Sequence, residues 1–354
     1  MHFMKKGILS LLILLLAIVI TACGEEANST SDGEGGQSDG KSNSEIQELT
    51  VKFSHVVAEN TPKHQGALAF KEFLEEKSDG KIEVQVYPNS SLFGDNDEVD
   101  NLTANNVQFI APDLSKFVGM NPAFNVPSLP FLFGSNEEAY AFWDGKKGQE
   151  VLSSLEDQGI IGLRMWPNGP KQITNNKHPI KTPEDLDGMK IRVQGGQVLA
   201  SVYETLGAGP LQLPFGELYT ALEQGTVDAQ INTFSNIATK KLGDVQGYMT
   251  TNWGATRVDY AVFTNKEFWS SLNEPTKKLF EDAIEKATET ERNLAEKLNK
   301  EAMETLKERG NMEIYELTTE ERQVFLEALK PVYDEYADKI GQDVIDAARE
   351  AAAN

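Results

Sequence analysis

The chain reads Lys190-Ile191-Arg192-Val193 at one predicted strand and Val227-Asp228-Ala229-Gln230-Ile231-Asn232 at the next, with the helical block Pro214-Phe215-Gly216-Glu217-Leu218-Tyr219-Thr220-Ala221-Leu222-Glu223-Gln224-Gly225 between them. Side chains alternate between the two faces of a strand, so Arg192 points to the face opposite its two apolar neighbours. A guanidinium between two β-branched residues is poorly hydrated and needs an anion. Either an internal carboxylate or a ligand can supply that anion.

Residues 1–22 are predicted to be a lipoprotein signal peptide. Lys5 and Lys6 give it a positive start, and the apolar run that follows is short for a membrane span. The run ends in small residues directly before Cys23, the only cysteine of the chain. Because a lone cysteine cannot form an internal disulfide, we expect Cys23 to carry a lipid after cleavage. An ordinary signal peptide or an N-terminal anchor helix is the alternative.

Residues 23–48 are predicted to be the lipidated cysteine followed by a disordered tether. The segment consists mainly of Gly, Ser, Asn, Asp and Glu, and it has too few apolar residues to bury a core. As a flexible coil it would span about 25–30 Å. Such a tether would hold a folded domain away from the membrane surface.

The net charge is strongly negative. The whole chain carries −22, and loss of Lys5 and Lys6 with the signal peptide leaves −24. This charge argues against nucleic acid and against electrostatic docking on anionic lipid. It also means that an anion-binding site must concentrate positive charge locally, against a repulsive background.

From residue 49 onward, short strands and helices alternate over about 300 residues. This length favours two α/β lobes over a single core. Apolar residues alternate over residues 49–53 and again over 82–86, and Thr61-Pro62 supplies an N-cap and a first-turn proline for the helix between them. This strand-helix-strand order predicts a largely parallel sheet.

A long helix is predicted over residues 275–309. It carries two apolar stripes, and residues 288–293 between them contain no large apolar side chain. This pattern is typical of a helix that packs on both lobes and bridges the gap between them. A helical tail over residues 318–352 follows, interrupted at Pro331.

The sequence gives little support to a metal site or an enzyme. The four histidines are not spaced as metal ligands, and no nucleophile elbow, P-loop or dinucleotide fingerprint is present. We therefore expect no cofactor and no catalysis, although a lyase that uses Arg192 to hold a carboxylate is the enzyme to consider.

Over residues 49–330 the chain resembles the DctP-type extracytoplasmic solute receptors of tripartite ATP-independent periplasmic (TRAP) transporters. The resemblance rests on the order and spacing of short segments, chiefly Phe53-Ser54-His55-Val56-Val57-Ala58-Glu59-Asn60-Thr61-Pro62-Lys63, Leu129-Pro130-Phe131-Leu132-Phe133, Lys181-Thr182-Pro183-Glu184-Asp185-Leu186, Gly188-Met189-Lys190-Ile191-Arg192-Val193 and Glu217-Leu218-Tyr219-Thr220-Ala221-Leu222. It implies a two-lobed, periplasmic-binding-protein-like α/β fold with a cleft, crossing strands and a long helix that spans both lobes. Lobe I is expected to comprise residues 49–168 and about 258–297, and lobe II residues 169–257 and about 298–354.

The resemblance also implies the ligand-binding residues. Arg192 corresponds to the arginine that grips the ligand carboxylate, and a planar fork matches a planar carboxylate. Asn232 would supply an amide to the same carboxylate, and Phe215 would pack beside the ligand. The alternatives are a structural ion pair for Arg192, a strand-end cap for Asn232 and a helix staple for Phe215.

Four further residues are candidates for ligand contact. His55 ends the first predicted strand and is expected to face the cleft, although lone histidines are usually structural. Trp166 and Asn168 lie at the expected crossing between the lobes, where they would touch ligand or pack the hinge. Lys171 stands where the family often has a second arginine, so it keeps the charge and loses the fork.

Departures from the family pattern bear on the ligand. Lys171, the loss of the usual neighbours of Asn232, and the glycines Gly195 and Gly196 after the arginine strand suggest a roomier, less charged pocket. Such a pocket would suit a sugar acid or another monocarboxylate instead of a C4-dicarboxylate.

The predicted function is that of a monomeric, extracytoplasmic lipoprotein on the outer face of the cell membrane. It would capture an organic acid, a C4-dicarboxylate or a sugar acid, by hinge closure and deliver it to a TRAP membrane permease. The alternative is a sensory lipoprotein that presents the same solute to a receptor kinase.

Overall fold

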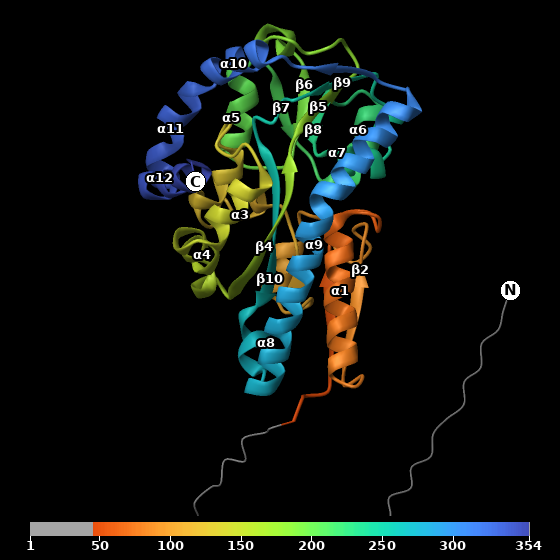
Figure 1. Cartoon of the computed structure of the whole chain (residues 1–354), viewed down its shortest axis with the longest axis vertical. Coiled ribbons are helices and arrows are strands. Elements are labelled where there is room, and N and C mark those ends of the chain that lie inside the picture. The colour runs from red at the N-terminus through yellow and green to blue at the C-terminus, as the bar shows by residue number, and fades with distance from the viewer. Residues whose placement is uncertain (1–44, 354) are drawn as a thin grey trace, which may run out of the picture. The chain divides into compact units, whose positions relative to one another are not determined.

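The computed structural model describes residues 45–353, which form two β-sheets and their covering helices (Figure 1). The predicted signal peptide, Cys23 and most of the tether lie outside the described residues. Within residues 45–353 no helix has the length and hydrophobicity that a membrane span requires.

The first sheet has the strand order β2-β1-β3-β10-β4. Its strands are β1 (Leu49–Ser54), β2 (Ile82–Tyr87), β3 (Phe109–Ile110), β4 (Ile160–Pro170) and β10 (Arg257–Asn265). β1 pairs in parallel with β2 and β3, whereas β10 pairs antiparallel with both β3 and β4. The prediction of a largely parallel sheet is therefore wrong here, because a strand from a distant part of the chain enters the sheet.

The second sheet has the order β11-β9-β5-β8-β6-β7. Its strands are β5 (Gln172–Asn175), β6 (Lys190–Val193), β7 (Gly209–Gln212), β8 (Ala229–Asn232), β9 (Tyr248–Thr251) and β11 (Glu313–Glu316). Both predicted strands of the opening segment, β6 and β8, are confirmed, and they pair in parallel. β8 ends at Asn232 as predicted but begins two residues later than expected.

The chain crosses between the sheets at two adjacent points. One residue, Lys171, separates β4 from β5, and a short segment after β9 leads into β10. The Lys171 N–H donates to the Thr256 carbonyl at 2.9 Å, and the Gly254 N–H donates to the Lys171 carbonyl at 3.1 Å. The two crossing segments are thus tied to each other, as the expectation of crossing strands required.

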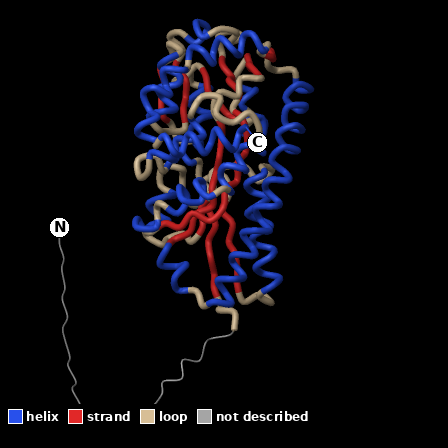
Figure 2. The backbone as a smooth tube through the Cα atoms, turned by 60° about the vertical axis from the view of Figure 1, so that its left-hand side comes forward, coloured by secondary structure: helices blue, strands red, loops and turns tan. Residues whose placement is uncertain are grey.

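Helices enclose the strands (Figure 2). The α-helices are α1 (Pro62–Lys77), α2 (Glu98–Thr103), α3 (Asn136–Asp144), α4 (Lys146–Ser153), α5 (Gln197–Thr205), α6 (Leu218–Glu223), α7 (Phe234–Thr239), α8 (Lys266–Ser271), α9 (Glu274–Arg309), α10 (Thr319–Ala328), α11 (Lys330–Ile340) and α12 (Gln342–Ala353). The 3-10 helices are η1 (Leu114–Lys116), η2 (Pro122–Ser128), η3 (Glu156–Gln158), η4 (Pro183–Leu186), η5 (Phe215–Glu217) and η6 (Leu242–Asp244). The side chain of Thr61 accepts from the His64 N–H at the start of α1, so the predicted cap is confirmed.

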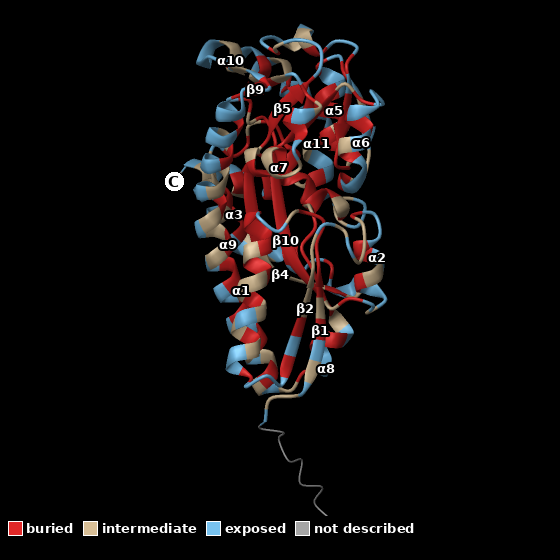
Figure 3. Ribbon diagram, turned by 90° about the vertical axis from the view of Figure 1, so that its right-hand side faces the viewer, coloured by how far each residue is buried: buried red, intermediate tan, exposed pale blue. Residues whose placement is uncertain are grey.

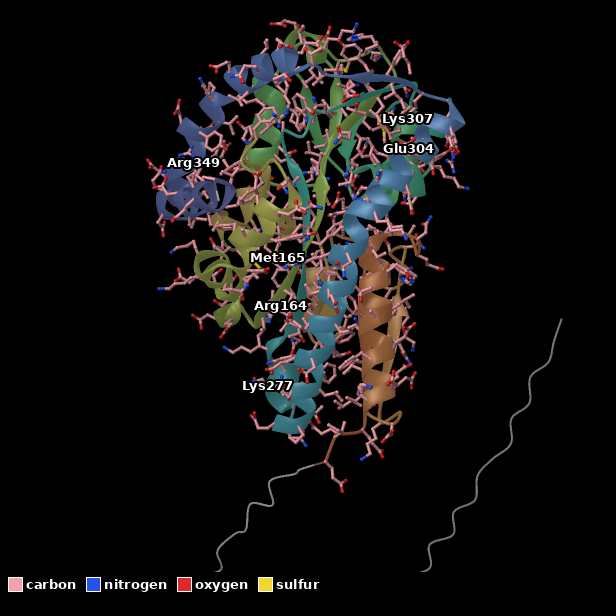
Figure 4. The ribbon with its side chains drawn as sticks, viewed as in Figure 1. Arg164, Met165, Lys277, Glu304, Lys307 and Arg349 are labelled. Atoms are coloured by element: carbon pink, nitrogen blue, oxygen red, sulfur yellow. The ribbon has the colours of Figure 1, made fainter. Side chains whose placement is uncertain are left out.

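The long helix α9 is confirmed. It has 36 residues, which gives about 54 Å at 1.5 Å per residue. Asn273 caps its first turn, and Gly310 ends it in the left-handed conformation at φ 63°. α9 packs on α1 and β4 of the first sheet and on α7, which follows β8 of the second. Figure 4 shows Lys277 near one end of this helix and Lys307 near the other.

The polar middle of α9 is buried against the crossing. Thr288 and Glu291 are both buried, and Thr288 accepts a hydrogen bond from the Trp166 indole at 2.9 Å. Gly66 of α1 allows this close approach, because a Cβ there would lie 3.0 Å from the Glu291 Cβ. Arg292 donates to the carbonyl of Met165 at 3.0 Å, which fastens α9 to β4.

The C-terminal tail consists of three helices, not two. Pro331 lies in the first turn of α11, so the predicted interruption is confirmed. A second break at Gly341, with φ 106°, separates α11 from α12 and was not predicted. The inner strands, such as β10, β5 and β8, and the inner faces of the helices are the buried parts of the fold, whereas the edge strands β7 and β11 are largely exposed (Figure 3).

Candidate functional site

A small cavity of about 30 Å³ lies where loops of the first sheet meet loops of the second. The first sheet contributes β10 and the loops after β1, β2 and β3, and the second sheet contributes β6, β8 and the segments that follow its strands. The cavity therefore lies between the two sheets, as the resemblance implies for a cleft. Its lining residues are Val56, Val57, Asp95, Asp113, Lys116, Arg192, Gln194, Phe215, Asn232, Asn236, Val258 and Tyr260.

Arg192 reaches this cavity from the middle of β6. Its two strand neighbours are buried in the core on the other face of the sheet, and its own side chain is 0% exposed. The Nε atom donates to the Leu213 carbonyl at 2.9 Å, which fixes the plane of the guanidinium. Neither Nη1 nor Nη2 has a hydrogen-bond partner among the described residues. Burial lowers the pKa of Arg192 to about 10, so it remains charged at neutral pH.

Arg192 is therefore a buried cation whose two outer nitrogens are free to donate. A buried charge without a partner is costly, and an anion in the cavity would relieve that cost. The alternative of a structural ion pair finds no support, because no carboxylate lies within salt-bridge distance of Arg192 in the described part of the chain.

Asn232 reaches the cavity from the carboxyl end of β8, where α/β sheets commonly bind ligands. Its Oδ1 accepts from the Thr233 N–H at 3.1 Å and from Asn236 Nδ2 at 2.8 Å. Its Nδ2 bonds to no other described residue. Asn232 thus offers an amide donor on the same wall of the cavity as Arg192.

Phe215 lines the cavity at the start of η5, with its ring centre 6.0 Å from the Arg192 guanidinium carbon. Its N–H donates to both carboxylate oxygens of Asp95 at 3.2 Å. Lys116 lies 3.3 Å from Asp95 and donates to the Gln194 carbonyl at 3.2 Å. Asp95 and Lys116 belong to loops of the first sheet, so these contacts hold the two sides of the cavity together.

Lys171 is buried beside this site but does not line the cavity. Its ammonium has no hydrogen-bond partner among residues 45–353. Burial lowers its pKa to about 8, and the neighbouring charges of Arg192 and Arg257 act in the same direction, whereas Asp113 and Asp259 oppose the shift. A second buried lysine, Lys63, lies 3.5 Å from the centre of the Tyr260 ring.

Three of the predicted candidates lie behind the cavity wall. His55 was expected to face the cleft, but it is fully buried and its Nε2 lies 3.0 Å from His64 Nδ1, because the residues that follow it, Val56 and Val57, form the wall instead. Burial holds the pKa of His55 well below its usual range. Trp166 binds α9, so it packs at the crossing and does not line the cavity.

Asn168 also forms hydrogen bonds at the crossing between the two sheets and does not line the cavity. Its Nδ2 donates to Thr233 Oγ1 at 2.8 Å, and its Oδ1 accepts from Asn299 on α9 at 3.1 Å. Of the seven predicted contact residues, the structure thus places Arg192, Asn232 and Phe215 on the cavity wall.

Sequence reasoning missed six polar residues of the wall, namely Asp95, Asp113, Lys116, Gln194, Asn236 and Tyr260. Asp113 carried a signal, because it follows β3 at the carboxyl end of a parallel strand. Asn236 carried another, since it lies four residues after Asn232 in the same segment. Within the described residues no group of histidine, cysteine and acidic side chains is arranged to hold a metal ion.

Comparison with known proteins gives a consistent result. The family described as "Bacterial extracellular solute-binding protein, family 7" (DctP) matches residues 53–339. The C4-dicarboxylate-binding periplasmic protein DctP of Shewanella loihica is 41% identical over 300 residues, which are 84% of this chain and 88% of the relative.

Two crystal structures resemble this fold over nearly their whole length. A TRAP periplasmic solute-binding protein from Shewanella oneidensis with bound succinate has a TM-score of 0.84 and 39% identity, and the match covers 86% of this chain and 99% of that one. The sugar acid binding protein DctPAm of Advenella mimigardefordensis in complex with galactonate has a TM-score of 0.84 and 31% identity, and the match covers 87% and 99%.

Proposed function

Because the chain belongs to the bacterial extracellular solute-binding protein family 7, the DctP-type receptors of TRAP transporters, we propose that it captures a C4-dicarboxylate in the cavity that Arg192 lines. Members of this family bind solutes for transport and are not enzymes. The open fork of Arg192 carries the proposal, since both of its outer nitrogens are buried and without a partner. One carboxylate would accept from Nη1 and Nη2 of Arg192 and from Nδ2 of Asn232.

The choice of a C4-dicarboxylate over a sugar acid rests on the sequence identity to known solute-binding proteins and on the residues that line the cavity. The relative named for C4-dicarboxylates and the structure with succinate are 41% and 39% identical, against 31% for the protein with galactonate. Lys171 does not line the cavity, so its replacement of an arginine is a weak guide to the ligand.

The two glycines that follow β6 are also no evidence for a wider pocket. Gly195 and Gly196 have φ of 158° and 86°. A Cβ on Gly195 would lie 3.0 Å from Nε2 of Gln212, and one on Gly196 would lie 3.3 Å from Oδ1 of Asn125. The loop therefore needs glycine for its close approach to neighbouring groups.

The remaining steps are part of the same proposal. Cys23 would carry the lipid that anchors the protein to the outer face of the membrane. The predicted tether of residues 24–48 is shortened to residues 24–44, because Gln47 accepts from and donates to groups at the start of α9. Closure around the solute would create the surface that a TRAP permease recognises.

A thermal-shift screen of the purified protein tests the proposed ligand. Succinate or L-malate at about 100 times the dissociation constant should stabilise the protein by about 2.7 kcal/mol. Galactonate and glucuronate serve as the competing class. A rise in melting temperature with the sugar acids alone would show that the ligand is a sugar acid and not a C4-dicarboxylate. No rise with any organic acid would refute the proposed site.

A further inference from the structure

Asn236, a residue of the cavity wall on the short helix α7, touches the proposed binding amide directly. It is 2% exposed, and its Nδ2 lies 2.8 Å from Oδ1 of Asn232 and 2.9 Å from the Tyr260 hydroxyl oxygen. Asn232 belongs to the second sheet and Tyr260 to the first. One amide group therefore connects the binding asparagine to the opposite side of the cavity.

The polarity of this chain of hydrogen bonds follows from a backbone group. The Thr233 N–H donates to Oδ1 of Asn232 at 3.1 Å, and a peptide N–H can only donate. Oδ1 of Asn232 is thereby an acceptor, so its second partner, Asn236, must present its NH₂ end. The Tyr260 oxygen then accepts from the same NH₂ group.

Neither Asn232 nor Asn236 can exchange the positions of its amide oxygen and NH₂ group without losing these hydrogen bonds. If Asn232 rotated its amide, its NH₂ group would face the Thr233 N–H and the NH₂ group of Asn236. If Asn236 rotated, its oxygen would lie 2.8 Å from the oxygen of Asn232. Buried donors or acceptors that face groups of their own kind cost free energy.

This matters because an asparagine amide has one donor end and one acceptor end of almost equal size. A carboxylate accepts hydrogen bonds, so only the NH₂ end of Asn232 can bind it. The opposite orientation would aim an oxygen at the anion.

We infer that Asn236 is a positioning residue, which holds the amide of Asn232 with its NH₂ group toward the bound carboxylate. The inference rests on the proposed function of the cavity, and it gives Asn236 an effect on affinity that acts through Asn232.

A double-mutant cycle with Asn232→Ala and Asn236→Ala tests the inference, with succinate as the ligand in isothermal titration calorimetry. We expect Asn236→Ala to weaken binding tenfold or more in the wild-type background and less than twofold in the Asn232→Ala background. Retained affinity in the single variant would overturn the inference. Equal losses in both backgrounds would also overturn it, because Asn236 would then act independently of Asn232.

Ser235→Ala is the matched control, since Ser235 lies on the same helix and is buried but does not line the cavity. It should keep the wild-type affinity for succinate. Melting of the ligand-free variants reports on the fold. A loss of affinity in Ser235→Ala as large as in Asn236→Ala would assign the effect to disturbance of α7, against the inference.

A ligand-free measurement separates this inference from the proposed function. If the wild-type protein binds neither succinate nor L-malate, the proposed function fails, and the orienting contact is then judged from the side-chain amide signals of Asn232 in ¹H–¹⁵N spectra. These signals should move in Asn236→Ala and stay in Ser235→Ala. Unchanged signals in Asn236→Ala would show that Asn236 does not hold the amide.

Discussion

At the scale of the residue, the fork of Arg192 is the feature on which the proposed recognition of a carboxylate depends. Arg192→Ala removes a buried group with two donor nitrogens that have no partner among the described residues, so we expect it to cost about 2–5 kcal/mol of binding, which is about 30- to several-thousand-fold in Kd. Arg192→Lys keeps the charge and loses the planar fork, and it should fall between the alanine variant and the wild type. Calorimetry with succinate measures both, with unliganded melting temperatures as the check on folding. Wild-type affinity in a folded alanine variant would contradict the clamp.

Also at this scale, the charge of Lys171 should make binding depend on pH. Its pKa is lowered to about 8 by burial, and a dianion in the adjacent cavity would favour its charged form. By linkage, affinity is then highest well below pH 8, where Lys171 is already charged, and it falls as the pH rises through that value. Binding of succinate measured from pH 6.5 to 9.5 should show this fall.

Lys171→Met separates this effect from other groups that titrate in the same range, since Lys63 also has a pKa lowered to about 8. The variant should bind more weakly at pH 7 and lose most of the fall between pH 7 and 9. A pH profile identical to that of the wild type would assign the dependence to another group.

At the scale of the element, we expect the proposed closure to depend on segments that follow strands of the first sheet. The carboxylate of Asp95 accepts a hydrogen bond from the N–H of Phe215, the first residue of η5. Asp95 also forms a salt bridge with Lys116, whose ammonium donates to the Gln194 carbonyl. Hydrogen bonds to charged groups contribute about 1.5–3 kcal/mol, so Asp95→Ala should speed ligand release about tenfold or more. Asp97→Ala, at an exposed position in the same loop, is the control. Stopped-flow dissociation of succinate tests this, and equal rates in the wild type and Asp95→Ala would remove Asp95 from closure.

The elements also show what sequence can and cannot predict. β6, β8, α1 and α9 follow from local signals, namely alternation, caps and apolar stripes, and all four are present. The antiparallel entry of β10 between β3 and β4 does not follow, because pairing of residues as far apart as Arg257 and Pro170, or farther, leaves no mark in a local pattern. Arg192 could be predicted from the sequence, because the alternation of side chains along its own strand already indicates that it is buried on the face opposite Ile191 and Val193. Asp95 and Tyr260 were missed because only the folded chain brings them to the same cavity.

At the scale of the whole molecule, a chain of net charge −22 has to bind an anion. The wall of the cavity itself carries two acids, Asp95 and Asp113, beside the cations Arg192 and Lys116, so it has no excess of positive charge. The buried cations behind the wall act at short range, whereas the negative surface acts at longer range. We therefore expect an approaching dianion to be repelled until it enters the cavity.

Salt should consequently speed association, which is the opposite of an electrostatically steered encounter. Between about 10 and 200 mM NaCl the screening length falls from about 30 Å to below 10 Å, so the repulsion of the surface is removed while the contacts of the buried Arg192 persist. The association rate of succinate should rise about two- to fivefold over this range, with little change in the dissociation rate. A monoanion such as galactonate is the control and should show a smaller rise. An association rate that falls with salt would mean that local cations, such as Lys240 beside the Phe215 ring, already steer the ligand against the charge of the whole protein.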